Sequence, residues 1–470
     1  MTYANFQSAR IVRSSWLDEG GRRLDCNPYM SGALEARDAL QTLAFPKEFL
    51  PEVTTSIFHA GREGRTWVND ESWGVPFLGS TDILSVDLSS QPLLAKFQVD
   101  RNPQFTLKRG WTLITRSGTI GRMAYVRPDL EGMACSEHVL RVVPDEEKIP
   151  PGYLYAFLSS RFGVPLVISG TYGAIIQHIE AGHLEKLPIP RFGHEFENAI
   201  HKTVEKAAQT RAEGHERYKL ATANALASGG LTDTSTRNWR ASRQASFSTF
   251  LNKTSSLRAL NYDPRMLELL ARIRKNKSIE LGGVLIRPPF RPNRFSRIDA
   301  EPGHGVQLVG QKEMFFSQWE GRWISWKGIP VKSEVVPPAG TIAVACIGTL
   351  GENEVFGRCI RVRRGQERFA LSDNVLQLRP DKSIVPSGYL FALLRSEVYF
   401  RIFRCMSVGG KQQVLHPDLI RNVPIPVVDS YSMTKVHELI VAGDELLDLS
   451  NELFLEAASM VEAKIGGEQL

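Results

Sequence analysis

The sequence predicts an α+β protein with two tandem homologous domains, each followed by a long helix, and the two helices packing as an antiparallel coiled coil. The first observation is an internal duplication. Residues 134–160 and 370–396 align without a gap at an offset of 236 residues, and about half of the positions are identical. The same offset superposes Pro188-Ile189-Pro190 on Pro424-Ile425-Pro426. A repeat this long indicates a duplicated domain, because solenoid repeats span only about 20 to 50 residues.

The second observation is a pair of long segments that lack proline and have helical spacing. One runs from Glu195 to Ala227 and the other from Tyr431 to Ile465. Small and apolar residues of the second segment recur at intervals of three and four, which is the seam of a coiled coil. These residues are Val436, Ile440, Gly443, Leu447, Ser450, Phe454, Ala457 and Val461. The first segment has a weaker seam, interrupted by Arg211 and His215. A pair of separate amphipathic surface helices is the alternative.

Each copy repeats one plan of elements, which is the third observation. A short helix comes first, then strands broken by Gly and Pro, a glycine turn, and a helix that begins at Pro-x-Gly-Tyr-Leu. The expected positions are a helix to about Leu43 or Arg274, a strand over 110–115 or 340–345, a turn over 118–121 or 348–351, and a helix from about Pro150 or Pro386.

These patterns give expected domain boundaries. The stretch between the first long helix and the second copy is rich in Ser, Thr, Arg and Asn, which is typical of a linker. The chain is expected to comprise a first domain over 1–192, a long helix over 193–229, a linker over 230–255, a second domain over 256–428 and a long helix over 429–466.

Composition narrows the class of protein. The chain has 470 residues, a net charge of +6 and a pI near 9.0, which permits nucleic-acid binding without requiring it. No run of 18 apolar residues is present, so we expect no membrane partner. The N-terminus lacks the pattern of a secretory signal. The five cysteines form no CxxC pair, which favours a reduced, cytoplasmic location without structural zinc.

No set of residues predicts catalysis, a metal site or a cofactor. Asn27-Pro28-Tyr29 is one proline short of the amino-methyltransferase motif, and no glycine-rich cofactor turn precedes it. Pro144–Lys148 contains the letters of a nuclease signature, but its acidic residues are adjacent and do not come from separate strands. His194-Glu195 lacks the second histidine of a zinc helix. Gly410-Lys411-Gln412 is only a fragment of a phosphate loop.

Basic and polar loops are the better candidates, because Arg, Lys and amide side chains contact phosphates and base edges. One loop interleaves four arginines with Phe290 and Phe295, and an earlier loop places two arginines near Phe58 and Trp67. The glycine turns and the loops before each Pro-Ile-Pro add further candidates. The candidate DNA-binding residues are Arg62, Arg65, Arg116, Thr119, Arg122, Tyr172, Gln177, Arg287, Arg291, Arg294, Arg297, Thr349, Lys411, Gln412 and Gln413. Solvated basic loops are the alternative.

The order of these motifs, repeated twice, resembles the specificity subunits of type I restriction–modification systems. The resemblance rests on the Arg-Leu-Asp opening, the Gly-Thr-Ile-Gly turn, the Pro-x-Gly-Tyr-Leu helix and the closing Leu-Pro-Ile-Pro, and it covers nearly the whole chain. It departs from the pattern in the second copy, where acidic residues at 352–354 replace Arg122 and Met123.

The resemblance implies that each copy is a target recognition domain that reads one half of a split sequence in double-stranded DNA. It implies that the long helices set the distance between the halves. It also implies a subunit without catalytic activity or cofactor, which docks adenine methyltransferase subunits and through them a restriction motor subunit. Two other classes stay open. One is a specificity scaffold of another anti-phage system, and the other is a stand-alone DNA methyltransferase or nuclease.

Overall fold

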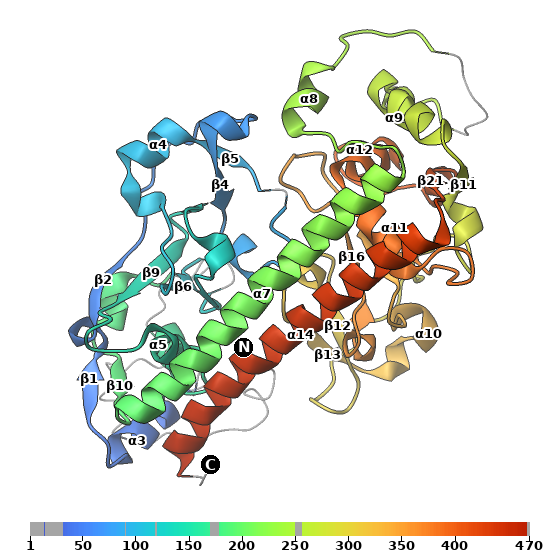
Figure 1. Cartoon of the computed structure of the whole chain (residues 1–470). Coiled ribbons are helices and arrows are strands. Elements are labelled where there is room, and N and C mark those ends of the chain that lie inside the picture. Colours follow the sequence, from blue (N-terminus) through green and yellow to red (C-terminus); the bar gives the residue numbers. More distant parts are fainter. Residues whose placement is uncertain are drawn as a thin grey trace. The chain divides into compact units, whose positions relative to one another are not determined.

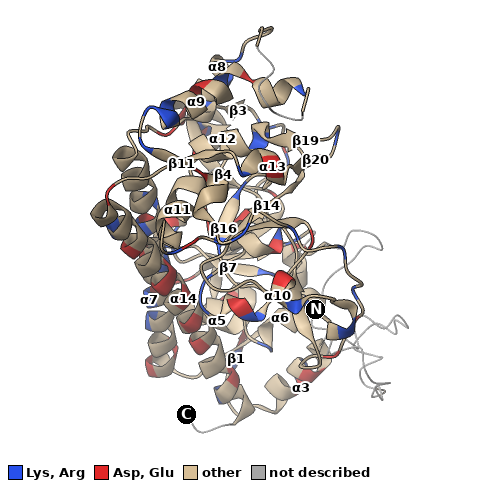
Figure 2. Cartoon of the chain, turned by 90° about the vertical axis from the view of Figure 1, so that its right-hand side faces the viewer, with Lys and Arg blue, Asp and Glu red and all other residues tan. Residues whose placement is uncertain are grey.

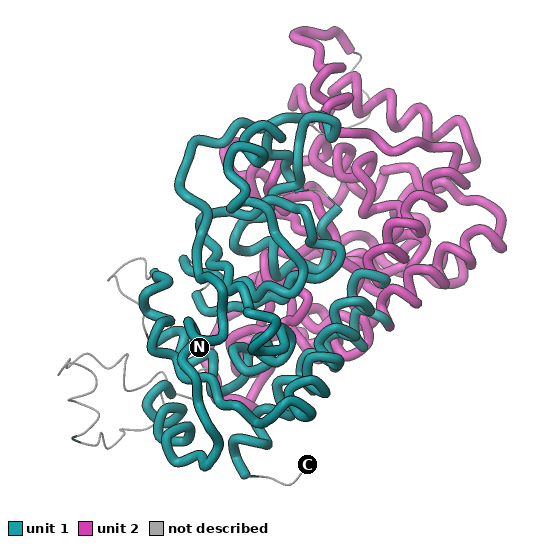
Figure 3. Tube along the Cα trace, turned by 60° about the vertical axis from the view of Figure 1, so that its left-hand side comes forward, with its two compact units in different colours: residues 1–213, 446–470 teal, residues 214–445 magenta. Residues whose placement is uncertain are grey.

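The computed structural model describes residue 14 and residues 32–89, 91–117, 120–169, 178–249 and 256–467. The chain divides into two compact units, one formed by Met1–Glu213 with Leu446–Leu470 and the other by Gly214–Glu445 (Figure 3). The division falls inside both long helices, which are α7 (His194–Ser228) and α14 (Ser430–Gly466). Each unit therefore holds one half of each long helix.

Among its described residues, the first unit has two four-stranded sheets and a small two-stranded one, and several of their strands are labelled in Figure 1. Their strand orders are β2-β9-β6-β7, β3-β5-β4-β8 and β1-β10. The strands are β1 (Lys47–Phe49), β2 (Thr54–Phe58), β3 (Trp67–Val68), β4 (Gly74–Leu78), β5 (Leu93–Ala95), β6 (Thr112–Thr115), β7 (Met123–Tyr125), β8 (Ala134–Cys135), β9 (Val139–Pro144) and β10 (Pro188–Pro190). The helices are α3 (Ala33–Thr42), α4 (Lys96–Arg101), α5 (Pro151–Leu158) and α6 (Gly163–Ser169).

The part of the second unit that the structure describes has three three-stranded sheets, ordered β13-β12-β17, β16-β14-β18 and β15-β20-β19, and the pair β11-β21. Its strands are β11 (Ser278–Glu280), β12 (Val306–Val309), β13 (Arg322–Ile324), β14 (Ile342–Ala345), β15 (Ile347–Gly348), β16 (Cys359–Arg361), β17 (Ala370–Leu371), β18 (Val375–Leu378), β19 (Ser407–Val408), β20 (Gln413–Leu415) and β21 (Pro424–Pro426). Its helices are α8 (Thr236–Ala241), α9 (Pro264–Arg274), α10 (Lys332–Val335), α11 (Ser387–Leu394), α12 (Glu397–Cys405) and α13 (Pro417–Ile420).

Each unit has its own central sheet, and the strands of the two sheets pair in the same register. In the first, β6 is antiparallel to both β9 and β7, and in the second β14 is antiparallel to both β18 and β16. Every residue of β6 and β14 is buried, as expected for a central strand covered on both faces. The mixed α+β class predicted from the sequence is therefore the observed one.

The Pro-x-Gly-Tyr-Leu motif docks a buried helix onto a long helix in both units. The backbone N–H of Gly152 donates to Nδ1 of His201 on α7 over 3.0 Å, and Gly388 does the same to His437 on α14 over 3.1 Å. A Cβ atom at either glycine would lie 2.9 Å from the Cα of the histidine, so only glycine permits this approach. The next residue, a tyrosine in both copies, donates its hydroxyl to the last carbonyl of Pro-Ile-Pro.

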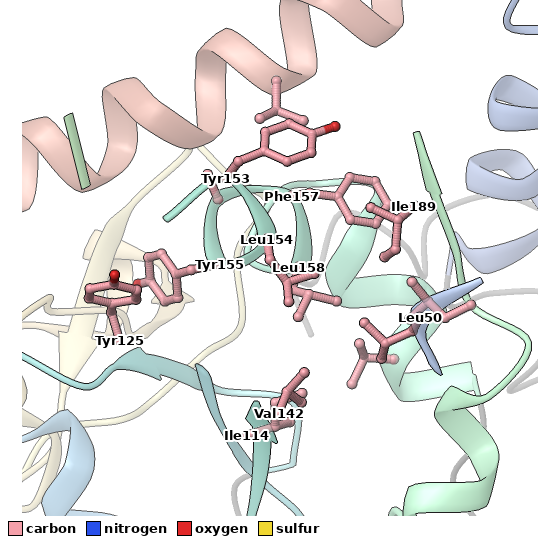
Figure 4. Close-up of a cluster of buried hydrophobic side chains, with 14 of the residues drawn as sticks. Leu50, Ile114, Tyr125, Val142, Tyr153, Leu154, Tyr155, Phe157, Leu158 and Ile189 are labelled. Atoms are coloured by element: carbon pink, nitrogen blue, oxygen red, sulfur yellow. The ribbon is translucent and has the colours of Figure 1, made fainter. Parts of the chain in front are cut away.

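Around α5, the first unit buries a continuous apolar cluster. In Figure 4, Tyr153, Leu154 and Leu158 extend from this helix, with Ile114 and Val142 of the central sheet nearby. The cluster also includes residues of both long helices, among them Ile200, Val204, Leu453, Phe454, Ala457, Val461 and Ile465. The core of the first unit is therefore completed by residues far away in sequence.

The long helices lie antiparallel to each other within each unit. In the first unit, the Ser450 hydroxyl donates to the carbonyl of Ala207 over 2.7 Å, and Arg211 donates to Ser450 over 3.1 Å. In the second unit, Gly443 lets α14 approach the Tyr218 ring so closely that a Cβ would stand 2.7 Å from it. Arg211, which interrupts the seam in the sequence, is buried and bonded to polar groups of α14.

The repeat also relates the second halves of the two long helices. The offset of 236 residues maps Tyr155 onto Phe391 and Tyr218 onto Phe454. The ring of Tyr155 contacts Phe454 at 5.4 Å in the first unit, and the ring of Phe391 contacts Tyr218 at 5.6 Å in the second. Each unit therefore has the same contact, but the partner ring comes from the long helix that follows the other copy.

Part of the stretch expected to be a linker forms the short helix α8. Trp239 of α8 lies under the guanidinium of Arg265 at 4.1 Å, and Thr236 accepts a hydrogen bond from Arg401 over 3.1 Å. This helix packs on its own unit. Among the described residues, no helix is long and apolar enough to cross a membrane.

Candidate nucleic-acid interface

Two of the predicted loops meet at one end of a small sheet in the second unit. Strand β20 pairs with β15, placing Gln413 opposite Gly348, and with β19, placing Val414 opposite Val408. Thr349 directly follows β15, and the exposed residues Lys411 and Gln412 directly precede β20. The glycine turn that begins at Gly348 and the hairpin between β19 and β20, which is called the polar hairpin below, therefore lie side by side, although they are about 60 residues apart in sequence.

The first unit makes the equivalent connection with a single bridge. Ser117 pairs with His178, and these positions match Ile347 and Val414 of the second unit. The backbone N–H of Ile179 also donates to the carbonyl of Arg116 over 3.1 Å. The candidates Thr119, Tyr172 and Gln177 lie outside the described residues, but Ser117 and His178 flank them.

Arg116 is held by the protein's own acceptors. Its guanidinium donates to the carbonyls of Ile179 over 3.1 Å and Glu137 over 3.3 Å, and it is paired with the carboxylate of Glu180. The Arg116 side chain is largely buried. This residue therefore joins the end of the central strand to the loop that precedes β10.

One acidic position of the repeat holds an arginine in each unit. Glu137 pairs with Arg65, and Asp373, which stands at the same repeat position, pairs with Arg297 over 2.6 Å. Arg65 also stacks over the ring of Phe77 at 4.6 Å. Burial works to raise the pKa of Glu137, but its hydrogen bonds and Arg65 outweigh burial and lower the pKa below the ordinary value. In each unit the arginine comes from a loop earlier in the chain and meets the acidic residue that precedes β9 or β18.

The other arginines of the second-copy loop differ in their surroundings. Arg287 stacks on Phe290 at 3.7 Å and lies 3.5 Å from the carboxylate of Glu334. Arg291 faces the thiol of Cys346, whose pKa burial raises to about 12. Arg294 is exposed, as is Arg62 of the first copy. Arg287, Arg291 and Arg297 are exposed as well, but each meets another group of its unit, so Arg62 and Arg294 are better placed to meet a phosphate.

Gln413 has a structural place in the polar hairpin. It is buried, and its amide donates to the carbonyls of Gly410 and Gly409 and accepts from the hydroxyl of Ser407 over 3.1 Å. These bonds close the turn and leave Lys411 and Gln412 as its exposed candidates.

The hydrogen bonds of the turns after β6 and β14 show which residues of the two turns are equivalent, and they differ from the equivalence expected from the sequence. The N–H of Gly121 donates to the carbonyl of Thr115, and the N–H of Gly357 donates to that of Ala345. Both glycines have a positive φ, of 75° and 87°. By this register, Arg122 corresponds to Arg358, since each accepts a hydrogen bond from the last residue of its central strand. The expectation that acidic residues 352–354 replace Arg122 and Met123 is therefore wrong.

The second turn is instead longer by six residues. Five residues separate Thr115 from Gly121, whereas eleven separate Ala345 from Gly357. The Gly-Thr-Leu-Gly motif of the second copy lies at the start of this longer turn. Arg122 is exposed, whereas Arg358 is paired with Glu397 and stacks on Phe400 at 3.4 Å.

Several residues that shape this region were not among the sequence candidates. Glu137 and Asp373 could have been found, because an acid recurs at one position of the duplication. Glu180 and Arg404 carry no such signal, because their counterparts at the same offset are His416 and Ile168. Their contacts depend on how the loops fold.

The charges on the long helices and the positions of possible metal ligands among the described residues do not indicate a catalytic or metal site. Acidic and basic residues alternate along α7, whereas α14 carries seven acidic residues and no lysine or arginine between Lys435 and Lys464 (Figure 2). Within the described part of the chain, no three His, Cys, Asp or Glu side chains are grouped to hold a metal ion.

The sequence matches no protein-family model and no curated protein. Solved structures align over most of the chain. They include the type I restriction–modification S subunit of M. genitalium, with 11% identity, 90% of this chain and 96% of that chain covered, and a TM-score of 0.37. The HsdS subunit of Thermoanaerobacter tengcongensis aligns with 14% identity, 91% and 98% coverage, and a TM-score of 0.29.

A third aligned structure comes from work on complex assembly and conformational transition of the type I R-M system. It has 13% identity, covers 90% of this chain and 97% of its own, and has a TM-score of 0.25. The aligned proteins are those that the repeated motifs resemble.

Proposed function

We propose that this chain is a non-catalytic, sequence-specific DNA-recognition subunit of a type I restriction–modification complex. Each copy of the repeat would read one half of a bipartite target in double-stranded DNA. The chain would dock adenine methyltransferase subunits, and through them a restriction motor subunit, in the cytoplasm. The long helices would set the separation of the two half-sites.

One observation carries this proposal. In each unit, the turn after the central strand pairs with the loop before the Pro-Ile-Pro strand, and an arginine from an earlier basic loop pairs with an acidic residue beside the central sheet. The scaffold of the two sites is the same, but their exposed side chains differ. Exposed Arg, Lys and Gln side chains on rigid loops are suited to phosphates and base edges. Two related scaffolds with different side chains suit two different half-sites.

A domain exchange tests the proposal directly. Residues 256–427 are replaced by the corresponding domain of a related chain with a different target, and the chain is purified with any subunits that accompany it. Selection from randomised duplex DNA should then yield a bipartite sequence in which only one half has changed. If both halves change, or if neither the original nor the exchanged chain selects any sequence, the proposal is wrong.

The enzyme alternative has a separate test. The absence of a glycine-rich cofactor turn from the sequence leads us to expect that the isolated chain neither binds S-adenosylmethionine nor methylates DNA. Isothermal titration and transfer of a labelled methyl group measure this. Methyl transfer by the chain alone, with contaminating methyltransferase excluded, would establish the stand-alone methyltransferase instead. A specificity scaffold of another anti-phage system would bind a bipartite DNA sequence without a copurifying methyltransferase.

A further inference from the structure

The turn between Ala345 and Gly357 contains the six additional residues of the second unit and is called the insertion below. Buried arginines of α12 hold it in place. Arg404 of α12 is buried, and its guanidinium donates to the carbonyls of Thr349 over 3.0 Å and Gly351 over 2.7 Å. A Cβ at Gly357 would stand 3.0 Å from the Cγ of Arg404, so the aliphatic part of this side chain packs against the positive-φ glycine. The position equivalent to Arg404 in the first unit is Ile168, which cannot make such hydrogen bonds.

One of the two glutamates in the insertion, Glu352, is paired with arginines of the same unit. Glu352 pairs with Arg401 of α12 over 2.7 Å and lies 3.9 Å from Arg240 of α8. Arg401 is buried, and it pairs in addition with Glu397 over 3.1 Å. The charge of Glu352 is therefore neutralised on the protein side. A loop fixed in this way loses little conformational freedom when it binds.

The exposed tip of the insertion has a distinct chemistry. Between Thr349 and Phe356 the sequence contains two glutamates and one asparagine, but no lysine or arginine. Leu350, Asn353 and Glu354 are exposed. A carboxylate without a neighbouring cation in the same loop is unfavourable beside a phosphate, because both are negative. Carboxylate and amide oxygens are instead acceptors for amino groups on base edges, and the pairings of Asn with adenine and of Glu with cytosine follow this rule.

We propose that the insertion of the second unit is a specificity-determining loop, in which Asn353 and Glu354 read amino groups of adenine or cytosine and Arg404 positions the loop. This inference rests on the proposed function and refines it for one half-site. Lys411 lies beside the loop through the pairing of Gly348 with Gln413, so the neighbouring hairpin supplies the contact to phosphate. Within this site, phosphate contact and base reading are assigned to different loops.

The test uses the full chain with the subunits that copurify with it, and selection from randomised duplex DNA. Asn353→Ala and Glu354→Ala should each reduce discrimination at one or two base pairs of a single half-site, by roughly 5- to 100-fold. The other half-site and the salt dependence of binding should not change, because no phosphate contact is lost.

Arg404→Met tests the positioning residue, because it keeps the packing on Gly357 but removes the hydrogen bonds to the loop. It should relax the same base pairs as the two tip variants. The matched control is Arg395→Met, which removes hydrogen bonds to Tyr218 and Thr222 of α7 in the same unit. The control should lower the melting temperature to a similar extent without altering the selected sequence.

Other outcomes would contradict the inference, and they can be told apart from a failure of the proposed function. If Glu354→Ala strengthens binding to all sequences and the selected motif is unchanged, the tip only repels phosphate. If the tip variants lose copurifying subunits but keep the motif, the loop is a protein contact. If the unaltered chain selects no sequence at all, the proposed function itself fails. If Arg404→Met and Arg395→Met affect the motif equally, Arg404 has only a structural role.

Discussion

Arginine side chains at the candidate interface divide into those that the protein holds and those that are exposed. Arg65 and Arg116 are paired with acidic residues of their own unit, Arg297 is paired with Asp373 but is itself exposed, and Arg62 and Arg294 are exposed. The sequence predicts where basic residues gather, because clusters of arginine and aromatic residues are visible in it. It cannot show which guanidinium groups meet an internal carboxylate, because Glu137 and Glu180 come close only after the strands pair.

The exposed arginines provide a prediction about salt dependence. Arg62→Ala and Arg294→Ala should each weaken binding similarly on selected and unrelated DNA. Each should also reduce the slope of log K against log salt by about 0.9, the value for one released counterion. Binding titrations at several salt concentrations measure both effects. Arg272→Ala on α9 is the control, since Arg272 is an exposed arginine paired with Glu268 and lies outside the candidate loops. A slope as steep as that of the unaltered chain would remove both arginines from the interface.

The two adjacent glutamines of the polar hairpin are expected to have different roles, Gln413 in the stability of the protein and Gln412 in DNA binding. Gln413→Ala should lower the free energy of unfolding by about 1 to 3 kcal/mol, because the side chain of Gln413 is buried and its hydrogen bonds to Ser407, Gly409 and Gly410 are lost. Gln412→Ala should change it by less than about 0.5 kcal/mol, as is usual for an exposed position. DNA binding should weaken in the second variant at unchanged stability. Denaturant unfolding and DNA titration of both variants decide this, and equal stability of the two would contradict the structural place of Gln413.

At the scale of elements, the duplication is what makes the fold readable from the sequence. The repeated motifs mark the same buried helix, the same strand pairs and the same approach of a glycine to a long helix. The correspondence of the glycine turns was misread because Gly-Thr-x-Gly occurs in both copies. The positive φ belongs to Gly121 and Gly357, and sequence alone does not show which glycine adopts that conformation.

The close approach of these elements gives a prediction about stability. Gly152→Ala and Gly388→Ala should each destabilise their unit by about 1 to 3 kcal/mol, because the added methyl group meets the backbone of the long helix. Gly182→Ala is the control, since a Cβ there would make only an ordinary contact at 3.8 Å. Thermal unfolding of the three variants measures the difference. Equal melting temperatures for all three would show that the long helices can shift without cost.

The histidines at this contact predict how stability depends on pH. Burial lowers the pKa of His201, helped by Arg109 and opposed by Glu205 and Glu146, and burial lowers the pKa of His437, helped by Arg361 and Lys382 and opposed by Glu438. Each neutral ring accepts a hydrogen bond at Nδ1. The unfolded chain therefore takes up these protons first. Their contribution to stability is full above about pH 6.5 and is lost as the pH falls through the lower pKa of the folded state.

Variants of these histidines separate their contribution from that of other groups. His201→Gln and His437→Gln keep a hydrogen-bond acceptor that does not titrate near neutrality. Each should flatten the dependence of the unfolding free energy on pH below about pH 6.5. His304→Gln, at an exposed position, is the matched control for the substitution itself. Denaturant titrations at several pH values provide the measurement, and a slope that survives both substitutions would assign the effect to other groups.

At the scale of the whole molecule, the two compact units divide inside both long helices, between Glu213 and Gly214 and between Glu445 and Leu446. Inserting four residues at both points adds about one helical turn, or about 6 Å, to each helix. If the helices set the separation of the half-sites, the gap between them should lengthen by about two base pairs, at 3.4 Å each. The half-site sequences should stay the same. Selection from randomised DNA measures the gap, and an unchanged gap would rule out this role of the helices.

The sharing of long helices between the units has a consequence for synthesis on the ribosome. The core of the first unit needs Leu453, Phe454, Ala457, Val461 and Ile465 as well as α5 and α7. At roughly 5 to 20 residues per second, translation from residue 208 to residue 465 takes about 13 to 50 seconds. During that interval Tyr155 and its apolar neighbours have no Phe454 to cover them. The nascent first unit is therefore a natural client for chaperones that bind exposed apolar surface, until the second copy has followed it out of the ribosome.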